Sequence, residues 1–245
     1  MKGAFKKKMK RIGRYTWELF KASFATSLMW ACAGTILLML TMKGENVSWT
    51  DNSLLWTVVC IVGGAAYNVL MAWANGGAHY EMLVSGNVKR MSAAEFDGGY
   101  KMSTHKEAKE YRIWKGFAIG GFSALAPLLF GLIFGANQTA INAGGMNRGL
   151  ATLLLLSFLM SGYSIVPLYL MNASGMSVSY YFSCLFALIP LAVTGGFYIV
   201  GAYAKRNKRM REMAIARKAE EEKTTKVKKI NYGALPGTKP KKRKK

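Results

Sequence analysis

The residues best suited to acid–base or metal chemistry gather in one polar stretch, residues 76–115. It holds both histidines of the chain, His79 and His105, and five of the twelve acidic residues. Those five acids are Glu81, Glu95, Asp97, Glu107 and Glu110. If this protein does chemistry at a membrane surface, this stretch carries it.

The spacing of these side chains fits no compact metal site. A His-x-Glu pattern occurs at His79 and again at His105, but the zinc-protease pattern His-Glu-x-x-His is absent. The cysteines Cys32, Cys60 and Cys184 lie far apart in apolar segments, so no cysteine pair completes a zinc ligand set. The sequence therefore predicts no metal ion and no other cofactor.

The apolar segments also lack the residues that nucleophilic catalysis needs. A serine nucleophile needs a base beside it, and the apolar segments of this chain contain serines but no histidine and no carboxylate. We therefore expect no catalytic residues and a protein that is not an enzyme. An enzyme acting at the membrane face is a third hypothesis, and it would have to use His79 or His105.

The elements around the polar stretch are long and apolar. Five segments follow one another at residues 22–42, 54–75, 116–136, 150–171 and 180–204. Each has about 20 to 25 residues, enough for a helix to cross a hydrocarbon core of about 30 Å. The chain is 51% apolar with a net charge of +22, and the two properties are segregated along it. This predicts an all-α polytopic integral membrane protein with four or five transmembrane helices.

The basic residues predict how the chain is oriented. Residues 1–21 form a basic interfacial segment with eight lysines and arginines, and the tail 205–245 has seventeen. By the positive-inside rule the N-terminus, the tail and the 76–115 loop are cytoplasmic, in a multi-pass protein of the cell membrane. We expect the helix of segment 54–75 to stop at Gly76-Gly77. The second half of the tail, rich in glycine and proline, is expected to be disordered.

The number of crossings conflicts with this orientation. Five crossings would put the two basic ends on opposite sides of the membrane. Segment 116–136 is our candidate for a re-entrant or broken helix, because it is rich in glycine and contains Pro127. Only Lys43 would then lie outside. The alternatives are an ordinary spanning helix with an external tail, or six crossings with one segment split.

A few residues inside the segments are candidates for a pore or for helix contacts. Asn68 is the most costly side chain to leave unpaired in lipid, so it must face another helix or a cavity. Gly120 and Gly121 allow close helix contact, and Pro127 can disturb its helix. For Asn68 an interhelical hydrogen bond is the simpler interpretation.

The basic tail predicts contact with anionic lipid headgroups. Its first candidates for lipid or partner docking are Lys205, Arg206, Lys208, Arg209 and Arg211. Nucleic acid, such as ribosomal RNA, is a weaker alternative. We also expect protein partners or a homo-oligomer.

Two functions remain open at this point. The first is a non-enzymatic membrane subunit or scaffold of a larger transport, secretion or envelope-assembly complex, docked through residues 76–115 and the tail. The alternative is a small homo-oligomeric transporter or channel for a neutral or anionic solute. The absence of charged side chains within the segments argues against a proton-coupled carrier.

Overall fold

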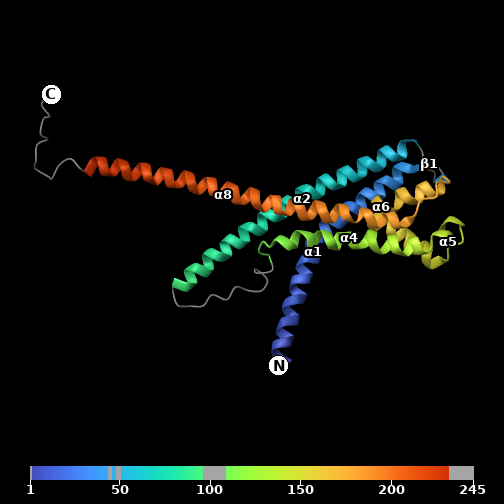
Figure 1. Ribbon diagram of the computed structural model, residues 1–245, viewed down its shortest axis with the longest axis horizontal. Helices are drawn as coiled ribbons and strands as arrows, with labels where there is room; N and C mark the ends of the chain where they lie inside the picture. The colour runs from blue at the N-terminus through green and yellow to red at the C-terminus, as the bar shows by residue number, and fades with distance from the viewer. Residues whose placement is uncertain (1, 44–45, 48–50, 96–108, 232–245) are drawn as a thin grey trace, which may run out of the picture. The chain divides into compact units, whose positions relative to one another are not determined.

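The computed structural model describes residues 2–43, 46–47, 51–95 and 109–231 (Figure 1). His105, Asp97, Glu107 and the last residues of the tail, 232–245, lie outside the described residues. The chain forms two compact units, residues 1–203 and residues 204–245.

The described residues are helical apart from short connections and one very short antiparallel pair of strands. The elements are α1 (Lys2–Thr41), β1 (Met42–Lys43), β2 (Asn46–Val47), α2 (Asp51–Glu95), α4 (Ile113–Ala136), α5 (Gln138–Asn142), α6 (Arg148–Ala173), the 3-10 helix η1 (Tyr180–Phe182), α7 (Ser183–Phe186) and α8 (Leu188–Asn231). Residues 204–231 of the second unit are the continuation of α8.

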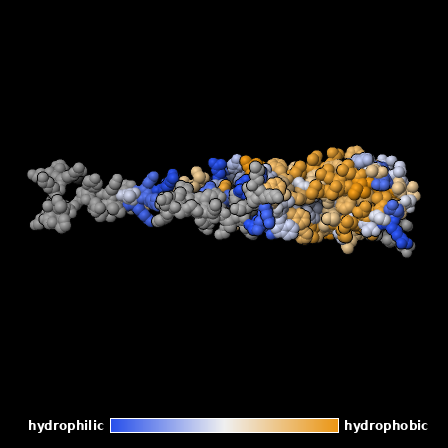
Figure 2. All heavy atoms as spheres, turned by 90° about the horizontal axis from the view of Figure 1, so that it is seen from below, coloured by the Kyte–Doolittle hydropathy of each residue, from blue (hydrophilic) through white to orange (hydrophobic). Residues whose placement is uncertain are grey.

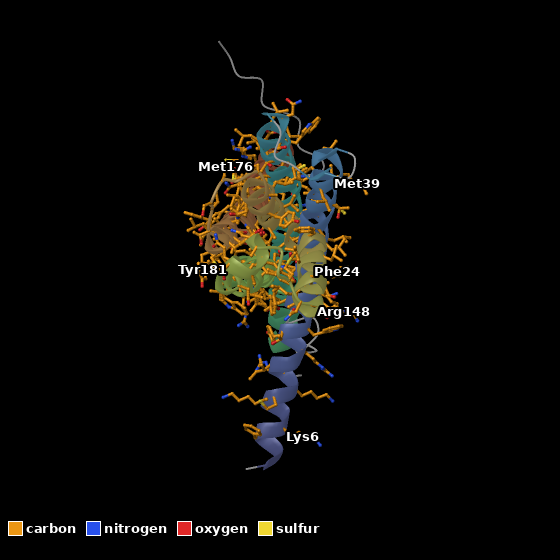
Figure 3. All side chains as sticks on the ribbon, turned by 90° about the vertical axis from the view of Figure 1, so that its right-hand side faces the viewer. Lys6, Phe24, Met39, Arg148, Met176 and Tyr181 are labelled. Atoms are coloured by element: carbon orange, nitrogen blue, oxygen red, sulfur yellow. The ribbon has the colours of Figure 1, made fainter. Side chains whose placement is uncertain are left out.

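Five of the helices are long and apolar enough to cross a membrane, as the sequence predicts. Figure 2 shows hydrophobic residues forming a broad belt over the first unit. Large apolar side chains point outward from it, including Phe24, Met39 and Tyr181. In Figure 3 Phe24 and Met39 lie on one side of the unit and Tyr181 on the other. An outward apolar surface of this kind suits a lipid environment.

Helix α2 does not stop at Gly76-Gly77, so the expected helix end is wrong there. The helix continues to Glu95, and Gly76 instead serves a contact with another helix: a Cβ at this position would collide with the backbone carbonyl of Tyr198 in α8. Gly201 meets the carbonyl of Trp73 in the same way. These two glycines allow α2 and α8 to cross in backbone contact.

Helix α4 is continuous through Pro127, so the expectation of a broken helix over 116–136 is wrong. Gly120 packs against the backbone of Pro190 and Leu191, and Gly131 packs against Ser183. The glycines of α4 therefore serve close packing against the chain from η1 to α8. The hydroxyl of Ser183 also donates a hydrogen bond to the carbonyl of Pro127, 3.0 Å away.

The broken helix is α6. Ser161 has non-helical backbone angles, φ −141° and ψ 31°, and separates two helices over residues 148–160 and 162–173. A Ser-Gly pair is a common cause of a sharp kink. The ring of Phe158 packs against that of Tyr169, with centroids 5.4 Å apart. In a straight helix these two residues would be about 16 Å apart along the axis.

Both ends of α6 lie at the same end of the bundle. Asn142 of α5 donates a hydrogen bond to Asn172, near the end of α6. Arg148, at its start, follows Asn142 by six residues, which can span at most about 21 Å. A straight helix of this length would separate its ends by about 39 Å. Thus α6 is a helical hairpin that enters and leaves on the side where α5 and β1 lie (Figure 1).

The tip of this hairpin reaches the middle of the bundle. A Cβ on Gly34 would lie 2.5 Å from the Cα of Gly162, and the rings of Trp30 and Tyr163 are 4.3 Å apart. Gly34 and Trp30 are central in the apolar part of α1. The tip is therefore held at mid-depth by α1, away from both ends of the helices.

Candidate functional site

The end of the first unit opposite the hairpin mouth contains a pocket of about 390 Å³, which we call the inner pocket. It lies between α1, α2 and the start of α4. Its polar lining is Glu18, Lys21, His79, Lys109 and Lys115, and its apolar lining is Leu19, Ala22, Ala78, Met82 and Ile119. Three ammonium groups and one carboxylate thus line one space.

Lys115 is the most unusual member of this lining. It lies in the first turn of α4 and only 1% of its surface is exposed. Its ammonium donates a hydrogen bond to the carbonyl of Glu110 and lies 5.7 Å from the ring centre of Tyr15. The backbone carbonyl and the aromatic ring compensate part of the cost of burying a cation.

Beside this pocket, His79 links α2 to α8 and to the short connection that precedes α4. Its Nδ1 is 2.9 Å from the hydroxyl of Tyr198, and its backbone carbonyl accepts a hydrogen bond from the amide of Tyr111. Tyr111 stacks on Tyr198 with ring centroids 5.4 Å apart. Burial raises the pKa of the Tyr111 hydroxyl above its ordinary value, as does the nearby Tyr203. This hydroxyl therefore stays neutral at physiological pH.

A second polar cluster lies at the hairpin tip. The hydroxyl of Ser183 in α7, which donates to the carbonyl of Pro127, also lies 3.0 Å from the hydroxyl of Ser164. On another face of α4, Ser27 donates to Ser123 at 3.2 Å. Small hydroxyl side chains let helices approach closely in a membrane while their polar atoms remain bonded.

Asn68 is buried, with only 1% of its surface exposed, and neither its amide nitrogen nor its oxygen has a hydrogen-bond partner among the described residues. The hydroxyls of Thr194 and Tyr163 and the indole nitrogen of Trp30 share this state. The interhelical hydrogen bond that the sequence suggested for Asn68 is therefore absent from the described part of the chain. A buried amide without partners is costly.

The structure places the other predicted residues at helix contacts. Gly120 meets the backbone of α8 and Pro127 meets Ser183, whereas Gly121 has only an ordinary contact with the side chain of Leu191. These residues do not line the inner pocket. The predicted docking residues Lys205, Arg206, Lys208, Arg209 and Arg211 lie on the helix of the second unit, where Lys208 pairs with Glu212 at 4.0 Å.

Sequence reasoning singled out His79 but missed the residues around it. The sequence alone places Glu18 and Lys21 in the basic interfacial segment 1–21, and Lys115 at the end of the 76–115 loop. For Lys115 the available signal is its place directly after Ile113 and Trp114, which puts a lysine inside the first turn of the apolar helix. No local pattern marks Glu18 and Lys21 in this way. Among the described residues, no group of three histidine, cysteine or acidic side chains could hold a metal ion.

Comparisons with known proteins do not assign this chain to a family. The chain matches no protein-family model, no curated protein and no solved structure.

Proposed function

We propose that this protein is an integral membrane protein of the cell membrane with four crossings, α1, α2, α4 and the chain from η1 into α8. The hairpin α6 enters the membrane and returns. Both termini and the segment after α2 are then cytoplasmic. The single observation that carries this proposal is the fold-back of α6 at Ser161.

The charge distribution supports the same topology. With α6 as a hairpin, 32 of the 34 lysines and arginines lie on the cytoplasmic side, and the exceptions are Lys43 and Arg148. Four crossings therefore satisfy the positive-inside rule without a broken α4.

A topology experiment tests this directly. Single cysteines replacing Gly145, Ser174 and Thr224 are introduced into a chain without its native cysteines and labelled in intact cells with a membrane-impermeant maleimide. We expect the first two to be labelled and the third to be protected until the membrane is permeabilised. Labelling of only one of the first two would mean that α6 crosses the membrane.

We further propose that the protein moves a small neutral or anionic solute across the membrane, as a homo-oligomer. Non-straight helices at membrane depth are tolerated where they are buried in protein or line a cavity, and such helices form substrate sites in many transporters. The tip of α6 combines this geometry with buried polar groups that lack partners among the described residues, at Tyr163 and at Trp30.

Flux into liposomes tests the transport proposal. Purified protein is reconstituted, and the uptake of a panel of labelled neutral and anionic solutes is compared with that of empty liposomes. We expect flux of one class, reduced by Asn68→Leu. The matched control Val62→Leu, on an exposed face of the same helix, should leave the flux unchanged. Absence of flux for the whole panel would count against transport.

A non-enzymatic subunit or scaffold of a larger complex is the second candidate. The observation favouring it is an exposed apolar surface on α2. Only 22% of the residues in the apolar stretch of this helix are buried, the smallest share among the five long apolar helices. Leu55, Val58 and Val62 are more than half exposed there. Purification from native membranes in mild detergent separates the two candidates, because stoichiometric partner proteins would favour the scaffold and a lone homo-oligomer the transporter.

A further inference from the structure

The inner pocket has the charge of an anion-binding site. Its lining carries the ammonium groups of Lys21, Lys109 and Lys115 against the one carboxylate of Glu18. The Lys21 ammonium is 3.1 Å from that carboxylate, so this pair largely compensates itself. The lining therefore holds more ammonium groups than carboxylates, with Lys109 and Lys115 in addition to the Lys21–Glu18 pair.

Lys115 places a positive charge at the start of α4. A cation in the first turn of a helix faces the positive end of the helix dipole. Burying an ammonium group also costs free energy, and the hydrogen bond to Glu110 is one of the interactions that offset this cost. An anion in the pocket would approach Lys115 and the first turn of α4 together, where the helix dipole favours a negative charge.

The rest of the lining suits an amphiphile. Leu19, Ala22 and Ile119 lie beside the charged groups and belong to the first apolar turns of α1 and α4. A phosphate ester with an acyl chain can place its charge near the lysines and its chain along these residues. Lysine is a common ligand for phosphate, acting as a point charge.

We infer that the inner pocket binds a phosphate ester, and that its source is the headgroup of an anionic phospholipid in the cytoplasmic leaflet. The leaflet follows from the topology under the proposed function, but binding itself requires no transport. A soluble phosphate ester shares the headgroup chemistry but not the acyl chain.

The test is a binding titration of the full chain in uncharged detergent, with three probes: short-chain phosphatidylglycerol, short-chain phosphatidylcholine and glycerol 3-phosphate. We expect phosphatidylglycerol to bind at least about tenfold more tightly than either of the others. Equal affinity for glycerol 3-phosphate would support the phosphate site and overturn the lipid source. Binding of neither anionic probe would overturn the site itself.

Matched variants locate the binding. Lys109→Ala is expected to weaken phosphatidylglycerol binding by about fivefold, the size expected for one lysine near an anionic headgroup. Glu18→Gln is expected to strengthen it, because a repelling carboxylate is removed. Lys6→Ala and Lys8→Ala remove the same charge from exposed positions of α1 and should change the affinity by less than about twofold.

The variants also distinguish binding in the pocket from nonspecific electrostatic attraction of the lipid to the basic protein. If Lys6→Ala weakens binding as much as Lys109→Ala, the pocket is not the site. Lys115→Met is secondary, because loss of this buried group can unfold the protein, and thermal unfolding of each variant is measured beside its affinity. These measurements use no flux, so a failed transport assay leaves their outcome unaffected.

Discussion

Helices α4 and α6 make an instructive pair. They have 24 and 26 residues, both are strongly apolar, and each contains one proline, Pro127 or Pro167. Yet α4 is continuous, whereas α6 folds back on itself. The break in α6 is at Ser161, six residues before its proline. A proline in an apolar segment is therefore a poor guide to where a long apolar helix breaks.

What faces each helix explains the difference. Most glycines of α4 meet the antiparallel chain from Tyr181 to Tyr198, at points spread along the helix. A continuous α4 therefore brings these glycines into close contact with that chain. In α6, by contrast, Gly162 beside Ser161 meets Gly34 at a single point. Glycine spread along one face supports close packing of a straight helix, and glycine beside serine at one crossing point permits a turn.

The most decisive prediction separates the two helices by crosslinking. Cysteines replacing Phe158 and Tyr169 should be joined by a short thiol crosslinker, because these positions pack together in α6. Phe117 and Leu128 in α4 have the same spacing in sequence and should not be joined, because a straight helix separates them by about 16 Å. The readout is the mass of an intramolecular crosslink after proteolysis. Equal yields for both pairs would contradict the hairpin.

The second prediction concerns the tip. Gly162→Ala should lower the free energy of unfolding by about 2–3 kcal/mol, because the new Cβ would lie 2.6 Å from the Cα of Gly34 in a backbone that cannot yield. Gly149→Ala in the same element has only an ordinary contact and should be neutral or slightly stabilising. Unfolding in detergent measures both. A neutral Gly162→Ala would show that α1 does not hold the tip.

The third prediction concerns the link between the two helices. Ser183→Ala removes the hydrogen bonds from α7 to Pro127 in α4 and to Ser164 in α6, and should cost about 1–2 kcal/mol. Ser177→Ala, at an exposed position nearby, should have no measurable effect. Equal stability of the two variants would mean that α4 and the hairpin are held together by apolar packing alone.

The smallest expected effect lies at the other end of the bundle. Tyr198→Phe keeps the ring against Gly116 of α4 but loses the hydrogen bond to His79, and should cost about 1 kcal/mol. Tyr67→Phe, at an exposed side chain of α2 twelve residues before His79, is the control. A larger loss for Tyr198→Phe would show that the junction, and not glycine packing, aligns α4 with α8.

The sequence was sufficient for the helical class and for the five apolar segments, because membrane-length runs of apolar residues are a strong signal. The charges at both ends also predicted that one segment does not cross the membrane, and this topology remains part of the proposed function. That segment was assigned to 116–136, because glycine content and Pro127 describe local flexibility and not the neighbouring surface. Whether a glycine permits a bend or a close contact depends on tertiary partners, as Gly76 and Gly120 illustrate.

The inner pocket could be predicted only in part. His79 and the basic residues near it were visible in the sequence, but their meeting with Glu18 and Lys21 depends on how α1 packs beside α2. Asn68 was correctly expected to be buried in the bundle. That its amide has no hydrogen-bond partner among the described residues was not expected. Burial follows from cost in lipid, whereas the partner depends on side-chain positions that no local pattern encodes.

The hairpin also has a consequence for the stability of this segment in a bilayer. The turn at Ser161 interrupts the backbone hydrogen bonds of α6, and exposed polar backbone is not tolerated in hydrocarbon. In the proposed membrane topology, residues 148–173 would therefore need the neighbouring helices for a stable position in the bilayer. The contacts that would hold them are those of Gly162 with Gly34 in α1 and of Ser164 with Ser183, which also bonds α4.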